Sequence, residues 1–173
     1  TKKEKQPLSV THPELAKEAN GWDPSRYSSG SNKNVEWLCP LGHIYKIRIN
    51  KRVARGTNCL VCSNHLILSG YNDLLTTNPE LASEAFGWEP SKKLPGGHTK
   101  LQWKCSNGHI YSASIINRLK NGSGCPFCSG LRALPGFNDL ATTHPSLSGE
   151  AFGWDPREVR AGSHKKLLWQ CSN

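Results

Sequence analysis

The sequence contains no methionine and no apolar run long enough to cross a membrane, and we expect neither a membrane span nor a secretory signal. Hydrophobic residues make up 36% of the 173 residues, which is too little for one large core. Acidic residues are also scarce, because 13 Asp and Glu stand against 22 Lys and Arg, for a formal net charge of +9. A basic excess of this size favours polyanionic partners.

Cysteine, in contrast, is concentrated in two matching stretches. Residues 37–62 read WLCPLGHIYKIRINKRVARGTNCLVC, and 66 residues later residues 103–128 read WKCSNGHIYSASIINRLKNGSGCPFC. In both, a Cys-x3-His pair is followed after 15 residues by a Cys-x2-Cys pair, which is the spacing of two zinc knuckles that face one metal ion. The predicted ligands are Cys39, His43, Cys59 and Cys62 in the first set, and Cys105, His109, Cys125 and Cys128 in the second.

Other uses of cysteine fit this pattern less well. A thioredoxin-like redox pair needs no Cys-x3-His at a fixed distance upstream, and seven cysteines cannot all pair as disulfides. A catalytic zinc keeps one position open, whereas four protein ligands close the shell. We therefore predict two structural Zn²⁺ ions in a reducing compartment. Cys171 begins a third, incomplete site, and because residue 1 is not Met we expect the chain to be a piece of a longer protein.

The repeat is wider than the metal motif. The pattern Thr-x-Pro-x-Leu of residues 11–15, Gly21-Trp22 and Trp37 all recur at intervals of 66. Such a period indicates an array of one supersecondary unit. We predict small α+β, metal-stabilised repeats that form tandem zinc ribbons, each a short helix plus a β-hairpin with two zinc knuckles. The predicted repeats are residues 1–68, 69–134 and 135–173, the last with only a helix, a first strand and a truncated zinc site.

The helix and the tryptophans of each repeat have predicted roles. In the second repeat Thr77 or Asn78 can cap the helix, and Pro79 suits its first turn. Glu18, Glu84 and Glu150 recur on this helix, and we expect a surface salt bridge there rather than a catalytic carboxylate. The two tryptophans of each repeat are expected to form a core between helix and zinc site, with base stacking as the alternative.

Basic residues are unevenly distributed between the repeats. Alternation over residues 45–50 predicts a strand with an apolar inner face and basic side chains outside. The first repeat has five basic residues between His43 and Cys59 and the second has two at the matching positions, so we expect the first to bind a polyanion most strongly. A solvated strand face is the alternative. The predicted nucleic-acid contacts are Lys46, Arg48, Lys51, Arg52, Arg55, Arg118 and Lys120, with Lys33, Lys100, Lys165 and Lys166 before the first knuckles.

The combined pattern W-x-C-x-x-G-H-x-Y, C-x-x-C-S, N-D-L, T-x-P-x-L, E-A and G-W resembles the tandem zinc-ribbon (treble-clef or zinc-ribbon-like) repeat domain of bacterial and phage proteins. The resemblance covers nearly the whole chain, and all eight predicted ligands match it. Members of this family are similar in being arrays, and some are fused to nuclease domains. The resemblance therefore implies a role directed at DNA.

These observations lead to three hypotheses about function. The first is a zinc-binding module of a longer protein that binds nucleic acid, chiefly double-stranded DNA, through phosphate contacts. The second is a protein-interaction scaffold, and the third is an accessory targeting part of a nuclease. We expect no catalysis within this chain, no small-molecule substrate and no membrane partner, and a cytoplasmic or nucleoid-associated location.

Overall fold

The structure, a computed structural model, describes residues 5–54 and 59–171. The chain divides into two compact units, one of residues 1–77 with 91–94 and the other of residues 78–90 with 95–173. Within the described ranges no helix is long and apolar enough to cross a membrane. The repeat boundaries after residues 68 and 134 stay predictions.

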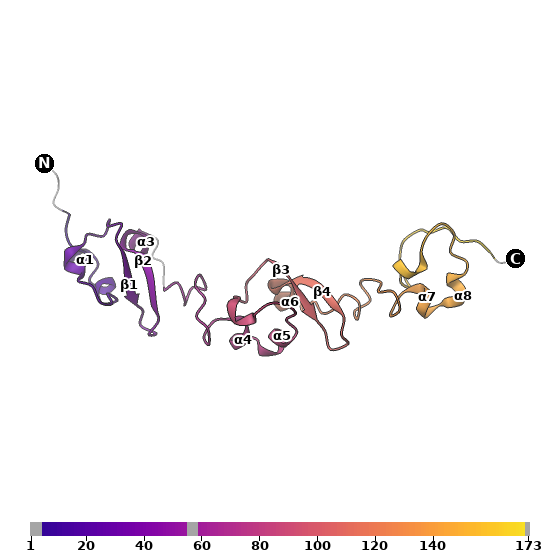
Figure 1. Cartoon of the computed structure of the whole chain (residues 1–173). Helices are drawn as coiled ribbons and strands as arrows, with labels where there is room; N and C mark the ends of the chain where they lie inside the picture. Colours follow the sequence, from indigo (N-terminus) through magenta and orange to yellow (C-terminus); the bar gives the residue numbers. More distant parts are fainter. Residues whose placement is uncertain (1–4, 55–58, 172–173) are drawn as a thin grey trace. The chain divides into compact units, whose positions relative to one another are not determined.

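The same elements recur in the same order along the chain (Figure 1). The first repeat has helices α1 (Leu8–Thr11) and α2 (Pro13–Ala16), the 3-10 turn η1 (Pro24–Arg26), strands β1 (Asn34–Leu38) and β2 (Ile44–Arg48), and helix α3 (Ile49–Ala54). The second has α4 (Leu74–Thr77), α5 (Pro79–Ser83), η2 (Pro90–Lys92), β3 (Lys100–Lys104), β4 (Ile110–Ser114) and α6 (Ile115–Lys120). The third has α7 (Leu140–Thr143), α8 (Pro145–Ser148) and η3 (Pro156–Glu158). The predicted small α+β fold is confirmed.

Two short helices replace the single helix that we predicted at the start of each repeat. The break falls at His12, Asn78 and His144, whose φ is near −140° and whose ψ is near 65°. Each of these residues precedes a proline, and the proline ring disfavours helical conformation in the residue before it. Asn78 makes no capping hydrogen bond with its side chain. The strong cap belongs to the preceding helix, where the buried Asp73 accepts the N–H of Thr76 at 3.0 Å.

The core of each complete repeat forms on one face of its hairpin. Strands β1 and β2 pair antiparallel with Trp37 opposite Tyr45, and β3 and β4 pair with Trp103 opposite Tyr111. All four side chains are buried. The second tryptophan of each repeat packs edge-on against the first, with ring centroids 5.0 Å apart for Trp22–Trp37, Trp88–Trp103 and Trp154–Trp169. The expected tryptophan core is therefore confirmed, and burial removes Trp37 and Trp103 from any base-stacking surface.

The strand over residues 45–50 is shorter than predicted, because β2 ends at Arg48 and Ile49 begins α3. The same change occurs at Ile115, and Ser114 caps α6 by accepting the N–H of Asn117. Ile49 and Ile115 are buried, as the alternation predicted, but they lie in helices. In the third repeat, the predicted first strand is reduced to one bridge between Ala151 and Trp169.

Glu18 and Glu84 form interior ion pairs, not the surface salt bridges that we predicted. Arg118 donates to the Glu84 carboxylate at 2.8 Å and also to the hydroxyl of Tyr111, which itself donates to Glu84 at 3.2 Å. The Arg118 side chain is 8% exposed and that of Glu84 is 32% exposed. Arg52 and Glu18 repeat the pair at 2.8 Å in the first repeat. Each guanidinium lies over the buried tryptophan, at 5.9 Å from Trp37 and 4.9 Å from Trp103.

The interior pair generates a prediction about stability. We expect Arg118→Ala to lower the free energy of local unfolding by about 2 kcal/mol, because it leaves Glu84 half-buried and unpaired, although partial exposure reduces the cost. Native-state hydrogen exchange at the Trp103 and Tyr111 amides measures this free energy. The control is Lys17→Ala, whose pair with Glu14 at 2.7 Å is exposed and should change it by less than about 0.5 kcal/mol. Equal effects of the two substitutions would contradict an interior role.

Candidate metal centres

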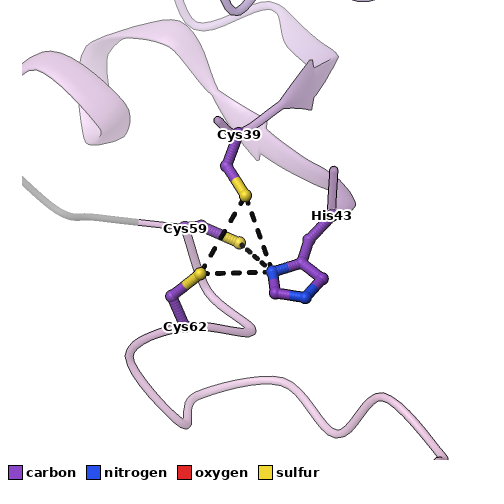
Figure 2. A group of neighbouring side chains, drawn as sticks. All are labelled: Cys39, His43, Cys59 and Cys62. Atoms are coloured by element: carbon purple, nitrogen blue, oxygen red, sulfur yellow. Dashed lines mark hydrogen bonds between the residues drawn. The ribbon is translucent and has the colours of Figure 1, made fainter. Parts of the chain in front are cut away.

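The ligands of the first centre are positioned by two tight turns. Cys39 follows β1 and His43 precedes β2, and the hairpin turn between them closes with the N–H of Gly42 donating to the carbonyl of Cys39 at 2.8 Å. Gly42 has a φ of +82°, which glycine adopts without strain. Cys59 and Cys62 lie in the second turn, after α3. The two turns bring the four side chains around one point (Figure 2).

The separations between the ligand atoms match a tetrahedral site. The Nδ1 atom of His43 lies 3.5 Å from the sulfur of Cys39, 3.2 Å from that of Cys62 and 3.9 Å from that of Cys59. The sulfurs of Cys39 and Cys62 are 3.9 Å apart. A tetrahedral Zn²⁺ with normal bond lengths places two sulfurs about 3.8 Å apart and a sulfur and a nitrogen about 3.6 Å apart. The site therefore fits zinc without rearrangement.

The second centre repeats this geometry and adds one hydrogen bond. The sulfurs of Cys105 and Cys128 are 3.8 Å apart, and Nδ1 of His109 lies 3.2 Å from Cys128 and 3.7 Å from Cys125. In addition, the side-chain amide of Asn107 donates to the Cys128 sulfur at 3.3 Å. The matching residue of the first centre is Leu41, which has no donor. The two sites thus share their ligands but not their surroundings.

The thiols of the first centre have unequal pKa values. Burial raises the pKa of Cys39, but hydrogen bonds from the backbone of His43 and Leu41 and from the other thiols outweigh it, so that the pKa lies below the ordinary value. Burial, then the hydrogen bonds with Cys59 and Cys39, raise the pKa of Cys62 to about 11. A zinc ion must displace the remaining thiol protons, so its binding weakens as the pH falls.

All eight predicted ligands are therefore brought together in two Cys3His sites, which bind two structural zinc ions. Cys39, Cys59 and Cys125 are buried, as expected for ligands of a closed site. Four protein ligands leave no open position for a substrate. Cys171 is exposed and belongs to neither site.

Residues that begin the next repeat complete each centre, and the sequence reading missed them. The ring of His43 packs edge-on against Tyr71 at 4.2 Å, and that of His109 packs against Phe137 at 4.3 Å. The adjacent Asn72 is buried and donates to the carbonyls of Val61 and Leu66, both at 3.0 Å. Its recurrence as Tyr71-Asn72 and Phe137-Asn138 was the available signal.

Asn138 repeats the arrangement at the second centre. Its side chain donates to the carbonyl of Phe127 at 2.7 Å and to that of Arg132 at 2.9 Å, and it accepts the N–H of Leu134 at 2.7 Å. Phe127 lies between two zinc ligands, Cys125 and Cys128. The asparagine therefore fixes the segment that leaves each Cys-x2-Cys turn.

The basic residues predicted to bind nucleic acid have different fates. Arg52 and Arg118 are engaged by Glu18 and Glu84 inside their repeats, so we remove them from the set of surface cations. Arg55 lies outside the described residues. Lys46 is exposed but pairs with Glu36 at 3.2 Å. The remaining predicted residues have exposed side chains: Lys33, Arg48, Lys51, Lys100, Lys120, Lys165 and Lys166.

We expect two zinc ions per chain by elemental analysis of the purified protein. Cys59→Ser should reduce the content to one, because three remaining ligands bind zinc more weakly. Cys171→Ser is the control and should keep two. A loss of zinc in the Cys171 variant, or full retention in the Cys59 variant, would be incompatible with this ligand assignment.

The aromatic residue beside each ligand histidine should affect only its own zinc ion. We expect Tyr71→Ala to weaken zinc binding at the first centre about 10-fold, because residues that orient a ligand typically contribute this much to metal affinity. Competition with a chromophoric chelator measures the two affinities. Phe137→Ala is the matched control and should weaken the second centre instead. If either variant affects both centres equally, the effect is general unfolding and not ligand positioning.

Comparison with known proteins agrees with the two centres. The family described as "Probable Treble clef zinc finger domain" matches residues 12–65 and 84–131. No curated protein matches the chain. Each family match contains one complete Cys3His set, and the helix that follows each hairpin supplies the approach to the second ligand pair. Because the two matches together cover more than half of the 173 residues, the chain belongs to this family of treble-clef zinc fingers.

Proposed function

We propose that this chain is a non-catalytic, zinc-stabilised module that binds nucleic acid, with double-stranded DNA as its ligand, through phosphate contacts. The observation that carries the proposal is the charge on the outer faces of both hairpins. In each hairpin the face opposite the tryptophan core presents lysine or arginine side chains from the strands to solvent. Zinc supports the proposal only indirectly, because it fixes these strands.

The outer face of the first hairpin carries Lys46 and Arg48 on β2. Strand pairing places Glu36 opposite Lys46, and their ion pair at 3.2 Å neutralises part of this charge. Arg48 lies opposite Asn34 and has no acidic neighbour across the strand. Lys33 adds to the same end, since its carbonyl accepts the N–H of Ile49 at 3.1 Å. The face therefore keeps a positive balance at the end away from the zinc ion.

The second hairpin carries its cations on the other strand. Lys100 and Lys104 of β3 have exposed side chains, and Gln102 stands where the first hairpin has Glu36. Across the pair lie Ser112 and Ser114 of β4, which carry no charge. The outer face of the second hairpin thus has two lysines and no acid. The expectation that the first repeat binds a polyanion most strongly came from counting charges along one strand, and pairing across the hairpin changes that balance.

A two-stranded ribbon with this charge suits duplex DNA. The major groove admits such a ribbon, and most hydrogen bonds in protein–DNA interfaces go to phosphates and sugars. Lysine and arginine that contact phosphates release counterions, so binding should depend strongly on salt. The side chains of Gln102 and Ser112 could contact base edges. The closed zinc shells assign the metal ions a structural role, and we propose that catalysis, if the longer protein has any, occurs elsewhere.

One observation favours the second hypothesis, a protein-interaction scaffold. The knuckle end of the first hairpin exposes three apolar side chains: Leu38, Leu41 at 69% and Ile44 at 59%. At the same positions the second hairpin has Lys104, Asn107 and Ile110, so it has no comparable apolar patch. Exposed apolar groups of this kind are typical of protein contacts. The patch is small, and the basic faces are present in both hairpins, so we favour nucleic acid.

We expect a variant with Lys46, Arg48, Lys100 and Lys104 changed to Gln to bind duplex DNA on the order of 100-fold more weakly at low salt. The slope of log K against log salt should decrease by about 3 to 4, because each lost phosphate contact removes about one released ion. Fluorescence anisotropy with a labelled duplex of about 20 base pairs measures both quantities. Elemental analysis should still show two zinc ions, because none of the four residues is a ligand.

The control variant removes the same charge elsewhere. Lys17, Arg26 and Arg157 are exposed residues paired with surface acids, and Lys5 lies before α1. Changing these four to Gln should leave DNA affinity within about 3-fold of the unmodified chain. Equal losses in both variants would mean that only net charge matters. No DNA binding by the unmodified chain at low salt would refute the proposal and favour a protein partner at the apolar patch.

A further inference from the structure

A second basic surface lies outside the hairpins, in a cleft that neither the zinc sites nor the hairpin faces use. The cleft has a volume of ≈ 310 Å³ and is formed by residues 131–133 on one side and residues 158–165 on the other. Its lining includes three cations, Arg132, Arg160 and Lys165, together with Glu158 and Ser163. We call it the joint cleft, because it lies where the segment that follows the second zinc centre meets the third repeat.

The two sides of the joint cleft are held in place by backbone contacts. The N–H of Arg132 donates at 2.9 Å to the carbonyl of Pro126, which lies between two zinc ligands. The carbonyl of Arg132 in turn accepts the side-chain amide of Asn138 at 2.9 Å. On the other side, Arg160 pairs with Asp139 in a backbone bridge. Arg132 is therefore fixed to the second zinc knuckle, and Arg160 to the residue after Asn138.

The contact between the two sides brings one guanidinium close to the knuckle. Gly130, two residues after Cys128, has a φ of +68°, and the position of a β-carbon there would be 3.9 Å from Nη1 of Arg160. Arg160 is half-buried, and it donates a long hydrogen bond of 3.4 Å to the carbonyl of Ala161. The remaining donors of its guanidinium have no protein acceptor among the residues that the structure describes.

The charge in the cleft is largely unbalanced. Among the described residues, Arg132, Arg160 and Lys165 form no ion pair. Glu158 is the acid of the lining, and it leaves a net charge of +2. Arg52 and Arg118 show the contrasting case, because each arginine there has a carboxylate partner at 2.8 Å. A cleft with three cations and one acid is an electrostatic site for an anion.

The preceding repeat shows that the fold does not require these cations. Counting back 66 residues from Arg132, Arg160 and Lys165 gives Leu66, Leu94 and Thr99. The residues that build the metal centres, the tryptophan pair and the interior ion pair are the same in both repeats, whereas these three are not. The positive charge is therefore a property of this one joint, which points to a ligand and not to folding.

We propose that the joint cleft binds a phosphate group, and that in a complex with nucleic acid it holds a backbone phosphate. The second clause rests on the proposed function, and the first does not. Guanidinium groups suit phosphate because their planar N–H donors match two oxygens at once, and a nearby lysine adds a point charge. The hydroxyl of Ser163 can donate to a third oxygen. Because Arg132 is attached to the second knuckle, the site needs zinc at the second centre but not at the first.

The first test uses inorganic pyrophosphate with the isotope-labelled, zinc-loaded full chain at low salt. We expect the largest changes in amide chemical shift at Gly130, Arg132, Arg160 and Ser163. Orthophosphate should produce the same pattern at higher concentration, because it carries less charge. Changes that are largest on the hairpin faces, or that are spread evenly over all lysines and arginines, would overturn the cleft as a site.

The second test uses duplex DNA and a variant that gives this joint the residues of the preceding one. We expect R132L/R160L/K165T to bind DNA about 10-fold more weakly, with a salt slope smaller by about 1, as for the loss of one phosphate contact. The matched control, K17Q/R26Q/R157Q, removes the same three charges from exposed ion pairs and should keep at least a third of the affinity. Two bound zinc ions and unchanged shifts in the β3–β4 hairpin establish that the variant is folded.

The outcomes separate this inference from the proposed function. If the chain binds DNA and the cleft variant behaves like the control, the joint cleft carries no phosphate and the inference fails while the proposed function stands. If pyrophosphate binds at the cleft but DNA does not bind to the chain, the phosphate site stands and the nucleic-acid function fails. The single substitution R132L, at an exposed position, repeats the test without touching the half-buried Arg160.

Discussion

Coordination of a metal ion by four side chains is the constraint on which the rest of this structure depends. Each hairpin has only two strands of five residues, and an isolated hairpin of that size is marginally stable in water. The helices of four to six residues are also too short to form alone. A structural zinc site contributes on the order of 10 kcal/mol, because the preformed site exists only in the folded chain. The metal therefore replaces the large core that a chain with 36% hydrophobic residues cannot build.

The other recurring groups extend this constraint outward from the metal. Trp37 and Tyr45 lie opposite each other on the hairpin whose turn holds Cys39 and His43, and Arg52 connects that hairpin to Glu18 in the preceding segment. On the other side of the metal, the buried Asn72 fixes the chain that leaves the Cys-x2-Cys turn. Each centre thus organises residues from well before the hairpin to the start of the next repeat, over a stretch of about 60 residues.

The sequence predicted the parts of this arrangement that depend on strict chemistry. Tetrahedral coordination allows few spacings, so the eight ligands could be read from the Cys and His positions, and a period of 66 separated the repeats. The short helices could not be placed in the same way. Ile49 and Val53 in α3 are compatible with a helical period and Ile47 and Ile49 with a strand, and six residues are too few to decide between them.

The partner of a charge was also beyond the reach of the sequence. Arg52 and Glu18 are separated by 34 positions, and their pairing depends on how the hairpin folds back over the helices. Counting basic residues along one strand therefore assigned Arg52 to the surface. Asn72 was overlooked because its role appears only when the chain after one metal centre is seen to return to it.

A comparison between repeats of one chain separates residues that build the fold from residues that do something else. The ligands, the tryptophans, the Glu–Arg–Tyr groups and the Asn after Tyr71 or Phe137 are found at equivalent positions, and in the structure each has a partner within its own fold. The exposed charges follow the opposite rule. Lys46 and Arg48 face solvent where the second hairpin has serines, Lys104 replaces Leu38, and Arg132 replaces Leu66. Because unpaired exposed charges contribute little to stability, their placement is free to follow a ligand. The zinc ions hold the repeats to one fold, and the differences between their surfaces are where recognition can be encoded.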